Sequence, residues 1–189
     1  ANSAFDSLNV GDSVSDTFSV VSSDGTQTSV TVTINGTNDA AVLSSASVHL
    51  AETNAALSTG GTLTISDVDN AEVFVAQTNV AGTHGVFNIG TDGVWTYVAN
   101  SAFDSLNVGD SVSDTFTVVS SDGTQTSVQV TINGTNDAAI LSSATVALNE
   151  TNTALSTGGT LTISDVDNAE VFVAQTNVAG THGVFNIGT

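Results

Sequence analysis

The stretch that decides the fold is Thr131-Ile132-Asn133-Gly134-Thr135-Asn136-Asp137-Ala138, which also occurs as Thr33-Ile34-Asn35-Gly36-Thr37-Asn38-Asp39-Ala40. Each copy begins like the end of a β-strand, with an apolar residue between polar ones. It continues as a short polar connector that carries an amide and a carboxylate. The two copies lie 98 residues apart (131 − 33). We interpret the stretch as the joint between two successive domains.

The same offset runs through the whole chain, which is therefore a tandem repeat. Residues 1–91 align with residues 99–189 without a gap, and 84 of the 91 positions are identical. A period of about 100 residues is too long for a solenoid unit and suits one β-sandwich domain per repeat. We expect a C-terminal part of one domain at 1–40, a complete domain at 41–138 and an N-terminal part at 139–189. We expect the two partial domains to belong to a longer array or to be completed by neighbouring chains.

The composition argues against several classes of function. The chain has 19 acidic residues and no Lys or Arg, so its formal net charge is −19. Phosphate contacts need cationic side chains, so we expect no nucleic-acid partner and no attraction to an anionic membrane surface. No apolar run reaches about 18 residues, so we expect no insertion into a membrane. Cys is absent, and no spacing of Ser and His resembles a catalytic triad, so we expect neither disulfides nor enzymatic activity.

Short segments of alternating apolar and polar residues predict seven strands in the complete repeat. They are expected at 47–51, 62–65, 73–78, 86–89, 94–98, 113–119 and 125–133. Residues 53–61 are polar and Gly-rich and are expected to form a loop. No segment has helical periodicity. The sequence therefore predicts an all-β fold made of tandem, Ig-like, seven-stranded β-sandwich domains.

Strand direction brings carboxylates of two repeats to the joint at 134–138. If the strands alternate in direction, the end of the first strand and the connector 99–111 lie at the C-terminal end of the sandwich. The turn at 165–168 then lies at the N-terminal end of the next sandwich. The candidate ligands at this joint are Glu52, Asp104, Asp110, Asn136, Asp137, Asp165 and Asp167.

Such a group of carboxylates repels strongly unless a cation neutralises it, and the chain supplies no basic side chain. Calcium takes 6–8 oxygen ligands of this kind, whereas the absence of Cys argues against zinc. The candidate ligands at the joint 36–40 are Asn38, Asp39, Asp67 and Asp69, with Asp6, Asp12 and Asp122 as weaker ones. The alternative is that these Asp residues only occupy turns, where Asp is favoured.

Several motifs resemble the VCBS-type repeat of giant bacterial surface proteins. They are Leu63-Thr-Ile-Ser-Asp-Val-Asp69, Asp92-Gly-Val-Trp-Thr-Tyr97, Leu106-Asn-Val-Gly-Asp110, Asp114-Thr-Phe116, Ser121-Asp-Gly123 and Ile132-Asn-Gly-Thr-Asn-Asp137. The resemblance covers residues 41–138 and both flanking parts. It implies cadherin-like or Ig-like domains of secreted RTX-type adhesins, located outside the cell or on its surface and stiffened by Ca²⁺ between domains.

Three functions follow as hypotheses. The first is a calcium-stiffened extender (spacer) that supports cell adhesion or biofilm formation, with neighbouring repeats as its partners. The second is a subunit of an extracellular filament or matrix, in which neighbouring chains complete the partial domains. The third is a glycan- or ice-binding module that uses Thr-rich strand faces or an aromatic platform at Trp95. The sequence does not indicate an adhesion target.

Overall fold

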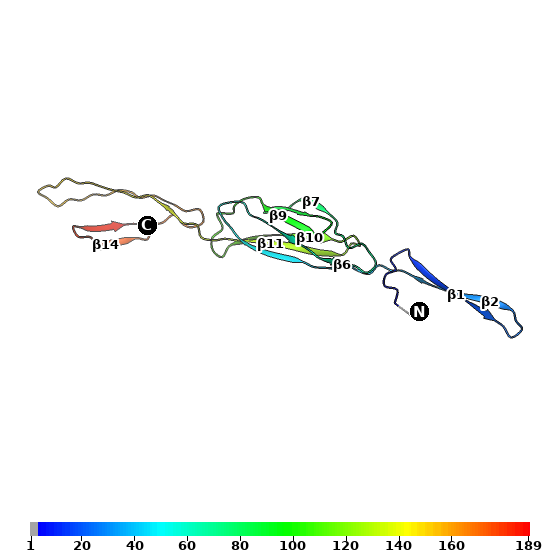
Figure 1. The fold of residues 1–189 in the computed structure, drawn as a ribbon. Coiled ribbons are helices and arrows are strands. Elements are labelled where there is room, and N and C mark those ends of the chain that lie inside the picture. The colour runs from blue at the N-terminus through cyan, green and yellow to red at the C-terminus, as the bar shows by residue number, and fades with distance from the viewer. Residues whose placement is uncertain (1–3) are drawn as a thin grey trace. The chain divides into compact units, whose positions relative to one another are not determined.

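The computed structural model describes residues 4–189, and every regular element within them is a β-strand. The strands are β1 (Ser13–Val21), β2 (Gln27–Asn35), β3 (Val42–Leu43), β4 (Ala46–Ala51), β5 (Ser58–Thr62), β6 (Ile65–Ser66), β7 (Gln77–Ala81), β8 (Gly85–Ile89), β9 (Val94–Ala99), β10 (Ser111–Val119), β11 (Gln125–Asn133), β12 (Ile140–Leu141), β13 (Ile163–Ser164), β14 (Gln175–Ala179) and β15 (Val184–Ile187) (Figure 1). The predicted all-β class is confirmed.

The chain divides into two compact units that alternate along the sequence. One unit comprises residues 1–49, 56–101 and 113–131, and the other comprises residues 50–55, 102–112 and 132–189. The joint at 36–40 and its candidate ligands belong to the first unit. The joint at 134–138 and its candidate ligands belong to the second unit.

Seven strands between residues 46 and 133 form two sheets. One sheet has the order β5-β9-β8-β7, with antiparallel neighbours, and the other has the order β10-β11-β4 (Figure 1). Strands β4 and β11 run in the same direction. At one end the Thr126 hydroxyl donates to Ser44 O (3.0 Å), and at the other end Glu52 N–H donates to Asn133 O (2.8 Å). These sheets are the seven-stranded β-sandwich that the sequence predicts.

Alternating side chains of the two sheets form the core. In β9, Trp95 and Tyr97 are buried, whereas the alternate residues Val94, Thr96 and Val98 are exposed. The ring of Phe87 from β8 stacks on that of Phe116 from β10, with 4.7 Å between the ring centroids, and lies 6.1 Å from the Trp95 ring. Trp95 is 2% exposed and therefore offers no aromatic platform to a ligand.

The prediction for the second strand is wrong in its position. The loop expected at 53–61 contains most of β5, which pairs with β9. Its glycines belong in the strand because Gly61 lies opposite Trp95, and a Cβ on Gly61 would come within 3.1 Å of the indole. Glycine thus provides space for a large core side chain here, and does not mark a loop.

The prediction for the third strand is shifted. The strand expected at 73–78 is β7, which begins only at Gln77. Before it, the chain crosses to the other sheet, where Val75 N–H donates to Val119 O (2.8 Å). Asn79 has a positive φ of 54°, and the register of β7 against β8 shifts around it. An alternating pattern does not reveal which sheet a segment joins.

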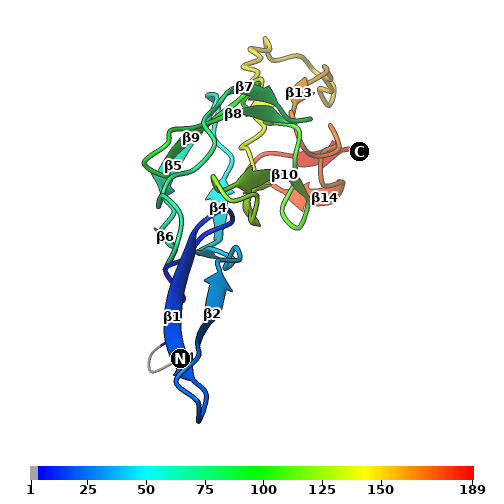
Figure 2. The same cartoon turned by 90° about the vertical axis from the view of Figure 1, so that its right-hand side faces the viewer.

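Flanking copies of core elements have exposed apolar faces. The hairpin β1–β2 repeats the hairpin β10–β11 with two substitutions and forms a long two-stranded ribbon (Figure 2). Its Phe18 is 54% exposed, whereas the matching Phe116 is 5% exposed. Likewise Phe185 in β15 is 53% exposed, whereas the matching Phe87 in β8 is fully buried. The same sequence is buried only where the opposite sheet covers it.

Candidate functional site

Close backbone packing positions the joint at 134–138 against the connector loop before β10. Gly134 N–H donates to Asp110 O (2.9 Å). A Cβ on Gly134 would lie 2.3 Å from Asn107 O and 2.4 Å from Leu106 O, so no larger residue fits without a backbone shift. A Cβ on Gly36 would lie 2.2 Å from Asn9 O and 2.4 Å from Leu8 O, the matching backbone oxygens. The Asn-Gly-Thr motif therefore reflects a close approach of two backbones.

Glu52 is the most buried carboxylate at this joint, with 2% of its surface exposed. Its Oε1 accepts hydrogen bonds from the backbone N–H of Thr135 (3.0 Å) and from the Thr135 hydroxyl. Its Oε2 is buried and has no hydrogen-bond partner within residues 4–189. A buried oxygen without a partner is costly, especially in an ionised group. The joint therefore fixes one oxygen of Glu52, whereas the other has no hydrogen-bond partner in the described chain.

Four further carboxylates converge with Glu52. The pKa of Asp137 is raised, first by its burial and then by the negative charges of Glu52, Asp167, Asp104 and Asp165. Asp104 Oδ1 and Asp137 Oδ2 are also buried without a hydrogen-bond partner in the described part of the chain. The structure thus gathers five of the seven candidate ligands at this joint and gives three of them an unpaired oxygen.

The turn that follows β13 contributes two carboxylates, those of Asp165 and Asp167, to the joint 134–138. Asp165 Oδ1 accepts hydrogen bonds from the N–H of Asn168 (2.9 Å) and of Asp167 (3.3 Å). The bond from Asn168 is the largest cause that lowers the pKa of Asp165, and burial opposes it. Asp167 Oδ2 accepts from Asp137 N–H (3.2 Å). The Asp-x-Asp turn is therefore bonded directly to the joint.

The other two candidates lie outside this group. Asp110 is exposed, and its Oδ2 accepts from Asn107 N–H (3.3 Å), as in an ordinary turn. Asn136 is exposed, and its side-chain amide donates to Asp137 O (2.8 Å). Among residues 4–189, no three His, Cys, Asp or Glu side chains form a ready-made metal-binding group. The charges of five carboxylates act at this joint, but in this arrangement no three of them form a group that could hold a metal ion.

The joint at 36–40 repeats this arrangement with less burial. Asn38 and Asp39 are exposed, and Asp39 N–H donates to Asp69 Oδ2 (3.1 Å). Burial raises the pKa of Asp67, but hydrogen bonds from the N–H of Asn70 and of Asp69 outweigh it, so the pKa is lowered. Asp67 Oδ2 is buried without a partner in the described chain. The position that matches Glu52 would precede residue 1 of this sequence.

The three weaker candidates near this joint behave as turn residues. Asp6 and Asp12 are exposed, and Asp12 Oδ2 accepts from Asn9 N–H (3.1 Å). Asp122 Oδ2 accepts from Ala41 N–H (2.9 Å), which attaches the β10–β11 turn to the start of the repeat. The Ser120 hydroxyl and then this N–H hold the pKa of Asp122 well below its usual range.

A row of side-chain amides at each joint was not predicted from the sequence. Asn107 Nδ2 donates to Asn168 Oδ1, and Asn168 Nδ2 donates to Asn136 Oδ1 (3.0 Å). We call these three residues the amide ladder. The same ladder at the joint 36–40 consists of Asn9, Asn70 and Asn38. The signal in the sequence is an Asn directly after each Asp-x-Asp, at Asn70 and Asn168, whereas Asn38 and Asn136 are predicted there only as cation ligands.

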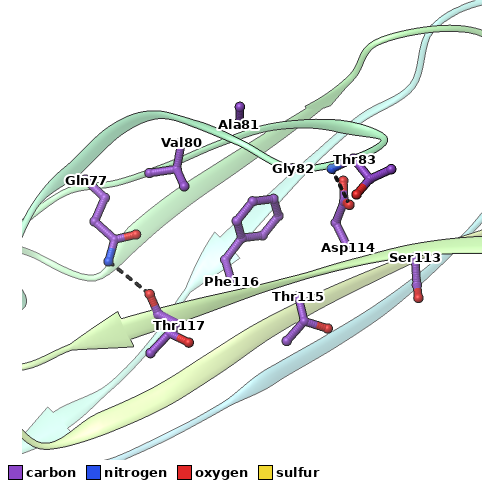
Figure 3. A pocket seen from close by; sticks show the side chains of 10 residues that line it. All are labelled: Gln77, Val80, Ala81, Gly82, Thr83, Ser113, Asp114, Thr115, Phe116 and Thr117. Carbon is purple, nitrogen blue, oxygen red and sulfur yellow. Dashed lines mark hydrogen bonds between the residues drawn. The ribbon is translucent and has the colours of Figure 1, made fainter.

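A groove lies between β7 and β10 (Figure 3). Phe116 forms its floor, Gln77 Nε2 donates to Thr117 O (2.9 Å), and Thr83 N–H donates to Asp114 Oδ1 (2.8 Å) (Figure 3). Asp114 is buried and also accepts from Tyr97 OH (3.0 Å). Burial is the largest cause that raises the pKa of Tyr97. The hydrogen bond to Asp114 and the negative charge of Asp114 raise it further. The groove's carboxylate is therefore already bonded within the protein, which indicates a structural role.

Comparison with known proteins identifies the family to which this sandwich belongs. No curated protein matches the chain. In the part of the chain that the structure describes, no helix is long and apolar enough to cross a membrane. The family model of the bacterial cadherin-like domain matches residues 38–134, which are more than half of the sequence and contain both sheets of the sandwich. The chain therefore belongs to the bacterial cadherin-like domain family.

Proposed function

We propose that the chain is an extender segment of a large secreted bacterial adhesin of the VCBS and RTX type, in which Ca²⁺ stiffens the joints between successive repeats. Domains of this family are typically non-enzymatic modules of extracellular adhesin-type proteins. The observation that carries the proposal is the convergence of five carboxylates, three of them with a buried unpaired oxygen, at the joint 134–138.

The residues present fit a hard cation. Glu52, Asp104, Asp137, Asp165 and Asp167 would hold it, and calcium would supply the positive charge that this group of oxygens lacks. Because the sequence has no Lys or Arg, the charge has to come from solution. Alkaline-earth cations prefer oxygen ligands, and no Cys is available for a thiophilic metal.

The position of the carboxylates explains how binding would stiffen the chain. In the proposed domain organisation, with partial domains at 1–40 and 139–189 and a complete domain at 41–138, Glu52 and Asp104 belong to one repeat and Asp165 and Asp167 to the next. A cation that contacts both sets would connect two domains through a joint of only a few residues. An array of such repeats would separate a distant binding domain from the cell and thereby support adhesion and biofilm formation.

The test is calorimetric unfolding of the chain with calcium and with excess chelator, together with small-angle scattering. Calcium binding to the native state alone raises the melting temperature and makes it depend on calcium concentration. We expect calcium to raise the melting temperature and also to narrow the distribution of radii of gyration that the scattering data give for the chain. Magnesium at the same concentration is the matched control for ionic strength. An identical melting temperature and identical scattering in calcium and in chelator would refute the proposal.

A second candidate function is a subunit of an extracellular filament, in which neighbouring chains complete the partial domains. The exposed faces of β1–β2 and of β14–β15 favour it, since their matching residues are buried in the complete repeat. Sedimentation velocity over a hundredfold range of chain concentration tests it. Concentration-dependent association that is lost in Phe18→Ser supports a filament. A monomer at every concentration excludes it.

A further inference from the structure

Thr135 gives two hydrogen-bond donors to a single oxygen of Glu52. Its backbone N–H lies 3.0 Å from Glu52 Oε1, and its hydroxyl donates to the same atom. The backbone of Glu52 is held as well, because its N–H donates to Asn133 O (2.8 Å). The end of β11 therefore fixes both the main chain and one carboxylate oxygen of Glu52.

The consequence concerns the second oxygen. With Oε1 held by Thr135, the planar carboxylate has a defined orientation, and Oε2 remains buried without a hydrogen-bond partner in the described chain. Among the neighbouring charges that raise the pKa of Asp137 after its burial, that of Glu52 has the largest effect, which indicates that the two carboxylates lie near each other. A carboxylate with free rotation would lose orientational entropy when it bound a cation, whereas this one is already oriented.

We propose that Thr135 is a positioning residue that orients Glu52 so that Oε2 alone is available to a divalent cation. This inference rests on the proposed calcium-binding function. A partner of this kind affects a metal site through the ligand that it orients, and its loss typically costs 10–100-fold in affinity. We therefore expect the hydroxyl of Thr135 to affect calcium affinity much more than calcium-free stability, because the backbone N–H still bonds Oε1 when the hydroxyl is removed.

The repeat supplies a matched control. Thr37 occupies the same position in the identical octapeptide of the other joint. It therefore has the same local sequence as Thr135, whereas the two hydrogen bonds to Glu52 Oε1 come from Thr135. A role that belongs to the octapeptide itself would appear at both threonines, whereas the positioning role requires Glu52 and appears only at Thr135.

The experiment is a calcium titration of the whole chain, followed by two-dimensional NMR at the amides of residues 135–137 and by calorimetry. We expect Thr135→Val to weaken calcium binding at this joint by about tenfold. We expect Thr135→Ser to restore wild-type affinity and Thr37→Val to leave it unchanged. The melting temperature in excess chelator should be nearly the same for all four proteins.

The outcomes distinguish the proposed calcium-binding function from the positioning role of Thr135. If the wild-type chain does not bind calcium, the proposed function fails. If the wild type binds and Thr135→Val binds equally well, the positioning role is refuted although the function stands. A lower calcium-free melting temperature of Thr135→Val with unchanged affinity assigns the hydroxyl a purely structural role and also refutes the inference. If Thr135→Val does not fold, Thr135→Ala is judged by the same criteria.

Discussion

The two joints have the same sequence but different electrostatic environments. In the joint 134–138, Asp137 is partly buried and its pKa is raised by burial and by four other carboxylates. In the joint 36–40, the matching Asp39 is exposed. The octapeptides are identical, and so are the Asp-x-Asp-Asn turns that face them. At the joint 134–138 the largest cause of the raised pKa of Asp137 is its burial, followed by the charge of Glu52, which comes directly after β4.

This comparison shows that the joint is a composite of three segments distant in sequence. The octapeptide and the turn of the next repeat supply hydrogen bonds at both joints, since Asp137 N–H bonds Asp167 as Asp39 N–H bonds Asp69. Glu52 adds a buried carboxylate at the joint 134–138. The backbone arrangement of a joint therefore depends on its own motif and on the turn that faces it, whereas the burial of its carboxylates also depends on residues outside both.

The largest expected effect is that of Glu52→Gln, which removes a charge and keeps an acceptor for Thr135. Calcium affinity depends on the number of charged ligands, so we expect it to fall about 100-fold at the joint 134–138. In chelator the same change reduces the repulsion around Asp137 and should not lower the melting temperature. Isothermal titration calorimetry and thermal unfolding measure the two effects.

The control for this substitution is Glu150→Gln, which removes the same charge at the exposed position 98 residues later. It should leave calcium binding at the joint 134–138 unchanged. Equal affinities for Glu52→Gln and the wild type would show that Glu52 does not account for the difference between the joints.

An intermediate effect is expected for the amide ladder. Asn168→Ala removes the bonds that Asn168 forms with Asn107 and Asn136 and should destabilise the calcium-free chain by about 1–3 kcal/mol. Because Asn70 forms the same ladder, Asn70→Ala should have a similar effect at the first joint. Urea unfolding in chelator measures both. If the substitutions reduced stability only in the presence of calcium, a role of the amide ladder that is independent of the cation would be contradicted.

The smallest expected effect is a pH dependence. The folded-state pKa of Asp137 is raised above the ordinary value of 3.8, so the folded state binds more protons than the unfolded state between these two values. Its contribution to the stability of the calcium-free chain is therefore complete below 3.8 and is lost as the pH rises through the folded-state pKa. The difference in melting temperature between the wild type and Asp137→Asn, measured against pH, should show this slope.

Asp39→Asn is the matched control for the pH experiment. It removes a carboxylate at the joint 36–40, whereas the four carboxylates that act on Asp137 are at the joint 134–138. A slope of equal size in both variants would mean that burial and neighbouring charge at the joint 134–138 do not decide the titration.

Much of the fold could be predicted because the alternation of apolar residues is local. Strands β8 to β11 follow directly from the pattern around Phe87, Trp95, Phe116 and Val128, all of which are buried. The misplaced strands are those in which tertiary packing overrides the local signal. Gly61 belongs to β5 because the indole of Trp95 needs the space, and this contact is 34 residues away in the sequence (95 − 61).

The candidate site could be predicted where strand direction alone brings residues together. Alternating strand directions place Glu52, Asp104 and Asp165 near one another. In the structure, the negative charges of all three raise the pKa of Asp137. The direction of each side chain could not be derived in this way. Asp110 bonds its own turn, and Thr135 faces Glu52, since both arrangements depend on the backbone approach at Gly134.

The parallel arrangement of β4 and β11 has a mechanical consequence. The chain enters the β-sandwich near Ser44, beside Thr126 at the beginning of β11, and leaves it after Asn133, beside Glu52, which follows β4. Tension applied to the two ends of the repeat therefore pulls these neighbouring strands in opposite directions along their length. The interstrand hydrogen bonds are then loaded in shear and have to break together, whereas a strand peeled from one end loses them one at a time.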